Sequence, residues 1–355
     1  MSYLFLFICL ISIAAIIITT IIYNNDKYKN YPHLVDIVYT WVESDEKFEK
    51  EKKFWLDKEN KFKNIDISLS NEKIRFENNE ELKYSIRSVE KYFPHYNNIY
   101  IIVKDGQYPK FLDLDNPKIK LIFHSEIIPA DYLPTYNSMS IELYLHHIPN
   151  LSEYYLYLND DFMFLKKTDI SYFINKNNIL YFNHDTSKYK LTDEMVVYAK
   201  NDKDNYEFKS GWCYNNFLLD SIGKKEDKGR YVITHMPKMY KKSYDKILED
   251  ILKNYYNEGE TINCFDKTGM SKFRKNSNLF LVALVKDYLY HYMFDTVEKQ
   301  SKLFLINMDE KNKNVDINMV KNYEFLCVAS ITTLGKDLYR KVMDTIYPLK
   351  SSFEK

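Results

Sequence analysis

The longest apolar stretch lies at the start of the chain. Residues 3–23 carry no charged side chain, and about twenty such residues, rising 1.5 Å each, are enough to cross a bilayer as a helix. A cleaved signal peptide is the alternative, but the stretch lacks a basic start and a small-residue cleavage site. We therefore expect a single-pass membrane protein, with an anchor and short tail in 1–24 and a polar linker in 25–35. Lys27 and Lys29 give little guidance on orientation, so the compartment stays open.

Beyond the linker, short apolar runs alternate with stretches of helical spacing. Runs rich in β-branched and aromatic residues, which predict strands, occupy residues 36–42, 99–103, 119–123 and 154–158. One helical pattern opens with Asn78 and Glu81, spaced as an N-cap pair, and continues through Leu82, Ile86, Val89 and Phe93. Residues 140–148 also fit a helix. The alternation predicts an α/β fold with a mostly parallel sheet, whose ligand crevice lies beyond the carboxyl ends of the strands.

The second half of the chain has a different pattern. Helical spacing dominates residues 236–257, 277–295 and 331–347. We expect an α/β half over 36–185 and a largely helical half over 186–355, which together form one catalytic domain.

Composition narrows the function classes. Lysines and arginines number 50, as do aspartates and glutamates, so the chain lacks the basic excess of a nucleic-acid binder. Seven glycines occur and none forms a GxG pair, which excludes Walker and dinucleotide-binding loops. The four cysteines are too scattered for a disulfide scaffold or a CxxC zinc site. A bound phosphate must therefore be held by side chains, by a metal ion or by a helix N-terminus.

Paired carboxylates follow the run at 154–158. Asp160 and Asp161 repel each other and lose hydration if they are buried, so something must offset that cost. Together with Asp36 and Glu142 they form an acidic set that could hold Mg²⁺ or Mn²⁺ on a nucleotide phosphate. A simple Asx turn explains the same residues equally well.

Basic and aromatic residues offer further candidates. Arg75, Arg87 and Arg274 could grip a diphosphate, although isolated arginines more often form surface salt bridges. His235 could act as a general base, and a structural histidine is the alternative. Trp41 could stack on a base or sugar, and core packing is the ordinary explanation.

Four blocks of sequence occur in a fixed order along the chain. The first is "DIVYTWVESDEKF" (36–48), and the second runs from "RFENNEELKYSIRSVEKYF" to "YYLYLNDDFMF" (75–164). The third combines "THMPKMYKKS" (234–243) with "TGMSKFRKNSNLF" (268–280). The fourth combines "YEFLCVAS" (323–330) with "IYPLKSSFEK" (346–355). Together these blocks, which cover roughly half of the chain and of which the second is the most specific, resemble the Stealth family of sugar-phosphate transferases.

The resemblance implies an activity. It implies a fold of the nucleotide-sugar transferase type, and transfer of a hexose- or N-acetylhexosamine-1-phosphate from a nucleotide-sugar such as UDP-GlcNAc. The acceptor would be a hydroxyl of a glycan or glycoprotein, and the products a phosphodiester and a nucleoside monophosphate. Polysaccharide biosynthesis and glycan modification are the settings that the family suggests.

The resemblance also assigns residues. Asp36 and Trp41 match the donor-site positions of the first block, and Glu142 and Asp161 match the acidic active-site positions of the second. His235 and Arg274 match the histidine and arginine of the third block.

We expect each matched residue to have a distinct role. Asp160 and Asp161 would hold a divalent cation, with Asp36 as a candidate third ligand. Arg274 and Arg87 would neutralise the transferred phosphoryl group, as phosphoryl transfer requires. In the same scheme His235 takes the acceptor proton, and Arg75 contacts substrate.

Two blocks depart from the family pattern. The second usually begins Arg-Phe-Arg-Asp, whereas Arg75-Phe76 is followed here by Glu77 and Asn78. The fourth usually reads Cys-x-Asn-Asp, whereas residues 327–330 read Cys-Val-Ala-Ser. Two alternatives therefore remain, a metal-dependent glycosyltransferase and a catalytically impaired, membrane-anchored glycan-binding relative.

Overall fold

A computed structural model describes residues 34–355, with gaps at 64–74, 258, 280–281, 302 and 309–314 and over most of 190–207. The predicted anchor at 3–23 and most of the linker at 25–35 lie outside the described residues. Within those that are described, no helix is long and apolar enough to cross a membrane. The longest, α2 (Glu46–Lys63), is densely charged. We accordingly correct the prediction of a single-pass membrane protein.

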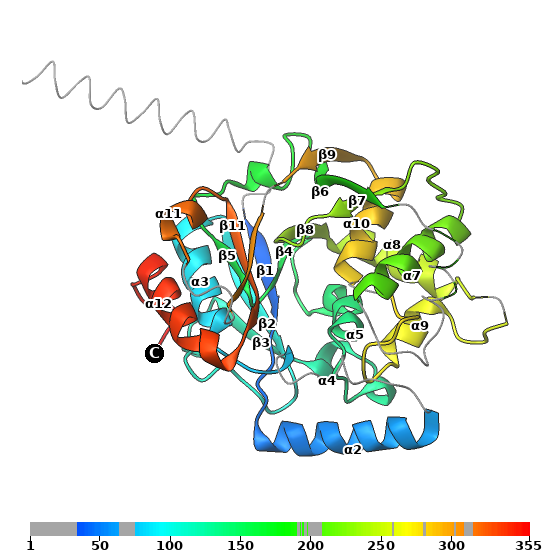
Figure 1. Cartoon of the computed structure of the whole chain (residues 1–355), viewed down its shortest axis with the longest axis horizontal. Helices are drawn as coiled ribbons and strands as arrows, with labels where there is room; N and C mark the ends of the chain where they lie inside the picture. Colours follow the sequence, from blue (N-terminus) through cyan, green and yellow to red (C-terminus); the bar gives the residue numbers. More distant parts are fainter. Residues whose placement is uncertain are drawn as a thin grey trace, which may run out of the picture.

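A five-stranded sheet forms the centre of the molecule, with strand order β3-β2-β1-β4-β8 (Figure 1). Its strands are β1 (Val35–Thr40), β2 (Tyr96–Val103), β3 (Ile119–Phe123), β4 (Tyr154–Asn159) and β8 (Lys238–Lys241). The first four are parallel, and β8 runs antiparallel to β4. Most side chains of β1 and β4 are buried, as expected for central strands that are covered on both faces. The prediction of a mostly parallel sheet is confirmed.

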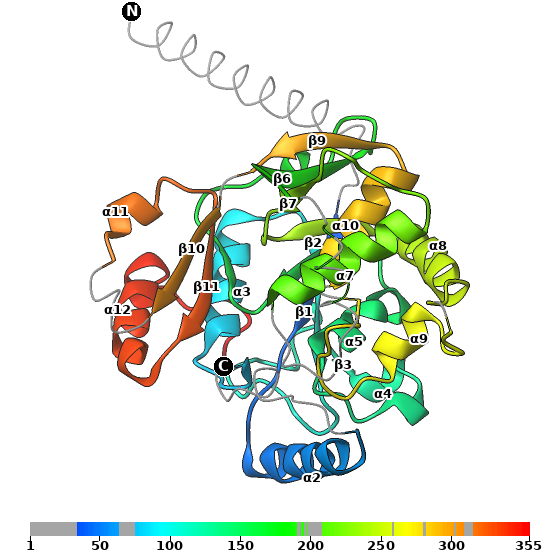
Figure 2. The same ribbon diagram turned by 45° about the vertical axis from the view of Figure 1, so that its right-hand side comes forward.

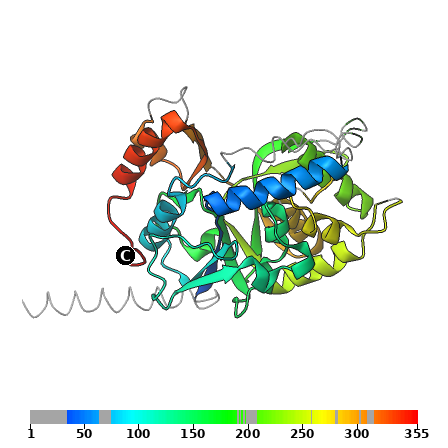
Figure 3. The ribbon, with the colours of Figure 1, turned by 90° about the horizontal axis from the view of Figure 1, so that it is seen from below.

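Helices cover both faces of this sheet. On one side lies α3 (Glu81–Tyr92), whose buried stripe includes Leu82, Ile86 and Val89. On the other side lie α5 (Ser138–Leu143), α8 (Lys242–Lys253) and α10 (Val282–Met293) (Figure 1). The charged helix α2 runs across one end of the molecule (Figure 3). Further helices are α4 (His124–Ile127), α7 (Phe208–Ser221), α9 (Cys264–Gly269), α11 (Ile317–Val320) and α12 (Lys336–Ile346).

The start of α3 differs from the predicted cap. The N-cap residue is Glu80, which has a left-handed backbone (φ 68°) and makes no side-chain cap. Asn78 instead accepts a hydrogen bond from the backbone N–H of Glu80 through its Oδ1. The carboxylate of Glu81 accepts from the backbone and side-chain amides of Asn79, which leaves Glu81 buried at the helix start.

The second half of the chain is mixed rather than largely helical. One small sheet has the order β10 (Leu303–Met308), β11 (Phe325–Ile331) and β5 (Phe162–Phe164). The other has the order β7 (Arg230–Ile233), β6 (Leu180–Tyr189) and β9 (Thr296–Gln300) (Figure 2). The expected division at 185/186 falls inside β6, and the helix expected at 236–257 begins with β8. We therefore correct the prediction of a helical half, because these segments pair as strands in both parallel and antiparallel ladders.

The two halves are packed into one another. β11 pairs with β5 from the first half, and β8 completes the central sheet. Helix α12 packs beside α3, with Tyr84 and Tyr339 in edge-to-face contact (Figure 3). Residues from both halves can therefore meet at the carboxyl end of the central sheet.

Candidate active site

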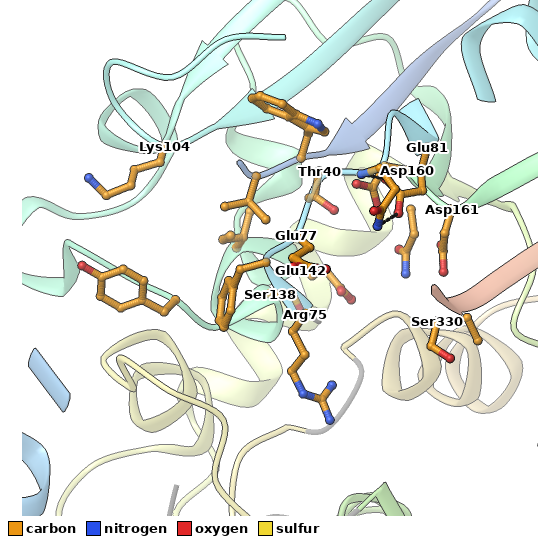
Figure 4. Close-up of a pocket in the computed structure, with 18 of the residues that line it drawn as sticks. Thr40, Arg75, Glu77, Glu81, Lys104, Ser138, Glu142, Asp160, Asp161 and Ser330 are labelled. Atoms are coloured by element: carbon orange, nitrogen blue, oxygen red, sulfur yellow. Dashed lines mark hydrogen bonds between the residues drawn. The ribbon is translucent and has the colours of Figure 1, made fainter. Parts of the chain in front are cut away.

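A pocket of about 400 Å³ lies where the parallel strands end. Four strands deliver residues to it: Trp41 follows β1, Lys104 follows β2, His124 follows β3, and Asp160 and Asp161 follow β4. Helix α5 and strand β11 complete the wall with Ser138, Glu142 and Ser330, and Arg75 and Arg274 come from loops. Figure 4 shows the cavity between Lys104 on one side and the two aspartates on the other.

Three carboxylates gather at the β4 end of the pocket. Burial, the carboxylate of Glu81 and the neighbouring Asp161 raise the pKa of Asp160 well above its ordinary range. Burial raises the pKa of Asp161 to about 7, against a hydrogen bond from Cys327 that lowers it. The pKa of Glu81 is also raised by burial. Each of these carboxylates therefore resists ionisation when no cation is nearby.

Asp161 has an unpaired oxygen. Its Oδ2 lies 3.4 Å from the Cys327 thiol, which donates to it. Its Oδ1 is buried and has no hydrogen-bond partner among the described residues. An orphaned carboxylate oxygen beside two further carboxylates is a suitable donor set for Mg²⁺ or Mn²⁺, both of which prefer oxygen ligands. The chemistry of the residues present thus fits a divalent cation here.

His235 lies beside Asp161 but is not among the residues that line the pocket. Ligand atoms of Asp161, His235 and Cys327 lie within 4.8 Å of one another. The imidazole ring packs edge-on against Phe162, with ring centroids 4.8 Å apart. Burial, helped by the charges of Lys238 and Arg274, lowers the pKa of His235 to about 4. The imidazole is therefore neutral at pH 7 and can accept a proton.

Arg274 and Glu142 also line the pocket. Nη2 of Arg274 donates to Oγ of Ser138 at 2.6 Å, which fixes the guanidinium at the start of α5. Glu142 is buried on the same helix. Its charge raises the pKa of the buried Tyr157 further above the ordinary value, beyond the effect of burial. The helix expected at 140–148 is not continuous, because α5 ends at Leu143 and a 3₁₀ turn follows at Leu145–His147.

Trp41 and Arg75 also line the pocket. Trp41 is only 4% exposed, so it contributes to the core as well as to the pocket wall. Arg75 is exposed and extends along the open side of the cavity (Figure 4). Both expected positions are therefore brought to the site.

Asp36 lies outside the pocket. It is fully buried near the start of β1, the end of the strand opposite to the pocket. Its carboxylate accepts hydrogen bonds from the backbone amides of Asn98 and Ser152, at 3.1 and 2.7 Å. These bonds tie β1 to β2 and to the loop before β4. The expectation that Asp36 contacts donor or metal is corrected to a structural role.

Arg87 also lies outside the pocket. Its Nε and Nη2 donate to the two carboxylate oxygens of Glu354 at 2.6 and 2.7 Å, and Nη1 donates to the carbonyl of Tyr347 at 3.0 Å. Each of the three guanidinium nitrogens of Arg87 therefore donates a hydrogen bond that holds the C-terminal segment against α3. The expected phosphate contact is therefore wrong.

The structure adds pocket residues that the sequence did not single out. Glu81 is the most important, because it completes the carboxylate cluster, and its spacing from Asn78 had suggested only a helix cap. Glu77 lines the same pocket and lies 3.4 Å from the ammonium of Lys336. Ala329 and Ser330, in the altered fourth block, form the wall beside Asp161. Residues at both departures from the family pattern thus line the pocket.

Comparison with known proteins gives the chain its relatives. Residues 75–187 match Stealth protein CR2, conserved region 2. The capsular polysaccharide phosphotransferase SacB of Neisseria meningitidis serogroup A is 31% identical over 339 residues, which cover 90% of this chain and 57% of SacB. The capsular polysaccharide phosphotransferase fcs1 of Haemophilus influenzae is 40% identical over 151 residues, covering 42% of this chain and 40% of fcs1. The chain therefore spans about half the length of these relatives.

Solved structures resemble the chain only distantly. A galactosyltransferase LgtC in complex with donor and acceptor sugar analogues covers 88% of this chain and 96% of its own, with 10% identity and a TM-score of 0.37. This similarity is too weak to support an argument about function.

Proposed function

Because this chain belongs to the Stealth family, we propose that it is a sugar-phosphate transferase. It moves a hexose- or N-acetylhexosamine-1-phosphate from a nucleotide-sugar to a hydroxyl of a glycan acceptor and releases a nucleoside monophosphate. The observation that carries the proposal is the cluster of Glu81, Asp160 and Asp161 with its orphaned oxygen, next to Arg274 in a pocket at the carboxyl ends of parallel strands.

The acidic cluster holds the donor diphosphate through a divalent cation. Asp160 and Asp161 are the proposed ligands, with Glu81 beside them. When bound, Mg²⁺ or Mn²⁺ supplies charge neutralisation for the diphosphate oxygens. Without such a charge the three carboxylates would have to share protons, which is the state that their raised pKa values describe.

Arg274 and Arg75 supply positive charge from the protein. The guanidinium of Arg274 is held by Ser138, so it is positioned before substrate arrives. A positioned guanidinium stabilises the charge that spreads over the transferred phosphoryl oxygens. Arg75, on the open side, binds the donor or acceptor as it enters.

His235 receives the acceptor proton. A neutral imidazole beside Asp161 can take the proton as the acceptor oxygen forms its bond to the β-phosphorus of the donor. The bond that breaks joins that phosphorus to the oxygen that bridges the two phosphates of the donor. This oxygen keeps the bonding electron pair and leaves as part of the nucleoside monophosphate. The sugar keeps its own bond to the phosphate oxygen, so its anomeric configuration is retained.

Product identity tests the proposal. The full chain is incubated with Mg²⁺, a glycan acceptor and a panel of nucleotide-sugars, and nucleotides are separated by chromatography. We expect a nucleoside monophosphate, and its loss in Asp161→Asn and His235→Ala but not in the control His95→Ala. Release of nucleoside diphosphate would indicate a glycosyltransferase. Donor binding without any product would indicate an impaired relative whose altered fourth block no longer supports turnover.

A further inference from the structure

A second group of metal-ligating side chains lies outside the pocket. His146 and His147 belong to a short 3₁₀ turn (Leu145–His147) that directly follows α5. Glu249 lies on α8. None of the three lines the candidate active site, and the proposed phosphoryl transfer does not use them.

The ligand atoms of this group converge on one point. Nε2 of His146 and Nε2 of His147 lie 2.6 and 2.9 Å from the same oxygen, Oε2 of Glu249. The other carboxylate oxygen, Oε1, is held by the ammonium of Lys253 at 2.5 Å. Lys253 thus fixes the orientation of the carboxylate and leaves Oε2 facing both imidazoles.

Exposure gives the group an entrance. The side chains of His146 and Glu249 are 4% and 9% exposed, whereas that of His147 is 38% exposed. Two ligands are therefore fixed by packing, and the third stands at the surface, where an ion and a water ligand can reach it. This combination differs from a buried hydrogen-bond network, in which every member is enclosed.

We propose that His146, His147 and Glu249 form a binding site for a zinc-class divalent cation that links the turn after α5 to α8. Two imidazole nitrogens and one carboxylate oxygen suit Zn²⁺, with water as the fourth ligand. At Zn–N and Zn–O bond lengths of about 2.0–2.2 Å, tetrahedral ligands lie about 3.4 Å apart. The three atoms therefore need to separate by less than about 1 Å, which the exposed His147 can provide.

A cation bound at this site would also affect the candidate active site through α5. Helix α5 brings Ser138 and Glu142 to the pocket wall. The turn that carries His146 and His147 begins two residues after this helix ends. A cation that ties this turn to α8 would hold α5 in place. Its expected effect is on stability and on the positioning of Glu142, because no ligand of the ion touches substrate.

Zinc titration of the full chain tests the site. The background is Asp161→Asn, which removes one ligand of the cluster near His235, and the readouts are calorimetry with ZnCl₂ and the melting temperature. We expect one equivalent of Zn²⁺ to bind and to raise the melting temperature. Excess Mg²⁺ should not displace it, since the ligands are mainly nitrogen.

Ligand variants decide between a metal site and a hydrogen-bond network. His147→Ala and Glu249→Gln should each weaken Zn²⁺ binding by more than about tenfold and abolish the rise in melting temperature. His95→Ala is the matched control, because His95 lies 4.0 Å from the carboxylate of Asp169, away from both ligand groups, and this variant should bind Zn²⁺ like its background. Absence of a tight equivalent in the background protein, or binding of Zn²⁺ by either ligand variant as tightly as by the background, would overturn the proposal.

Discussion

At the scale of single residues, the carboxylate of Asp161 sets the behaviour of the site. Its pKa is about 7 in the folded protein and near 3.9 in an unfolded chain, so the folded state holds an additional proton between these values. Its contribution to stability is therefore fully present below about pH 4 and is lost as the pH rises through 7. The titratable groups around it are Glu81, Asp160, Cys327 and His235.

Asp161→Asn should therefore stabilise the metal-free protein while it abolishes turnover. Above pH 7 the variant removes a buried charge that is repelled by its neighbours, a gain of at most roughly 4 kcal/mol. Urea unfolding at pH 8 and pH 5, with and without Mg²⁺, measures this. We expect Mg²⁺ to stabilise the parent protein more at pH 8 than at pH 5, and the variant to show no such difference. A variant that is less stable at pH 8 would contradict the account.

His235→Ala should lower turnover by about 10² to 10⁴-fold, the usual worth of a positioned general base. Added imidazole should restore part of the rate in this variant, and none in Asp161→Asn. Since burial lowers the pKa of His235 to about 4, the imidazole stays neutral above that value, and protonation of His235 should not limit turnover by the parent protein between roughly pH 5 and pH 8. Turnover by His235→Ala within tenfold of the parent protein would rule out the role of base.

The sequence predicted the acidic residues of the pocket correctly, but it assigned Asp36 and Arg87 to a site that they do not reach. Asp160, Asp161 and Glu142 follow or face strand ends, so their meeting could be anticipated from the α/β pattern. Asp36 and Arg87 carry suitable charges too, but their partners, Ser152 and Glu354, are distant in the sequence. Only the folded structure shows that these charges are already satisfied.

At the scale of elements, Arg87 joins α3 to the C-terminal segment. The side chains of Arg87 and Glu354 are 9% and 4% exposed. Arg87→Met leaves Glu354 as a buried, unpaired charge and should cost roughly 3 to 5 kcal/mol. Denaturant unfolding measures the loss, and the double variant with Glu354→Met should recover much of it. An increased KM for the donor without loss of stability would instead support the phosphate contact first predicted for Arg87.

Gly335 allows α12 to begin close to β10. A Cβ at this position would lie 1.9 Å from the carbonyl oxygen of Met308, a backbone atom that cannot move aside easily. Gly335→Ala should therefore destabilise the fold by more than about 2 kcal/mol. Gly223→Ala is the control, because that site is open and only its left-handed backbone (φ +83°) opposes a side chain. Equal losses for the two variants would contradict the packing described here.

Element prediction succeeded where burial is continuous. The strands β1 to β4 and the stripe of α3 are read directly from runs and spacings of apolar residues, because one chemical environment covers each element. Short antiparallel strands such as β8 and β7 have only four residues each, which is too few for an alternation of apolar and polar residues to be recognised. Their pairing with β4 and β6 is decided by tertiary contacts.

At the scale of the whole molecule, the interleaving of the two halves creates the pocket. Strand ends of the first half provide the carboxylates, and the second half adds Arg274 and the β11 wall to the pocket and places His235 beside Asp161. A donor bound between Lys104 and the aspartates would have its diphosphate at the acidic end (Figure 4). The expectation that phosphorus, rather than the anomeric carbon, is attacked comes from the similarity to capsular polysaccharide phosphotransferases.

The fate of the donor's β-phosphorus tests the central claim most directly. A nucleotide-sugar labelled at that atom is incubated with the full chain, Mg²⁺ and a glycan acceptor, with Asp161→Asn as the inactive control. If the chain transfers a sugar-1-phosphate, we expect the label to enter the acceptor as a phosphodiester and the released nucleoside monophosphate to be unlabelled. Recovery of the label in a free nucleoside diphosphate, with unlabelled sugar on the acceptor, would contradict it.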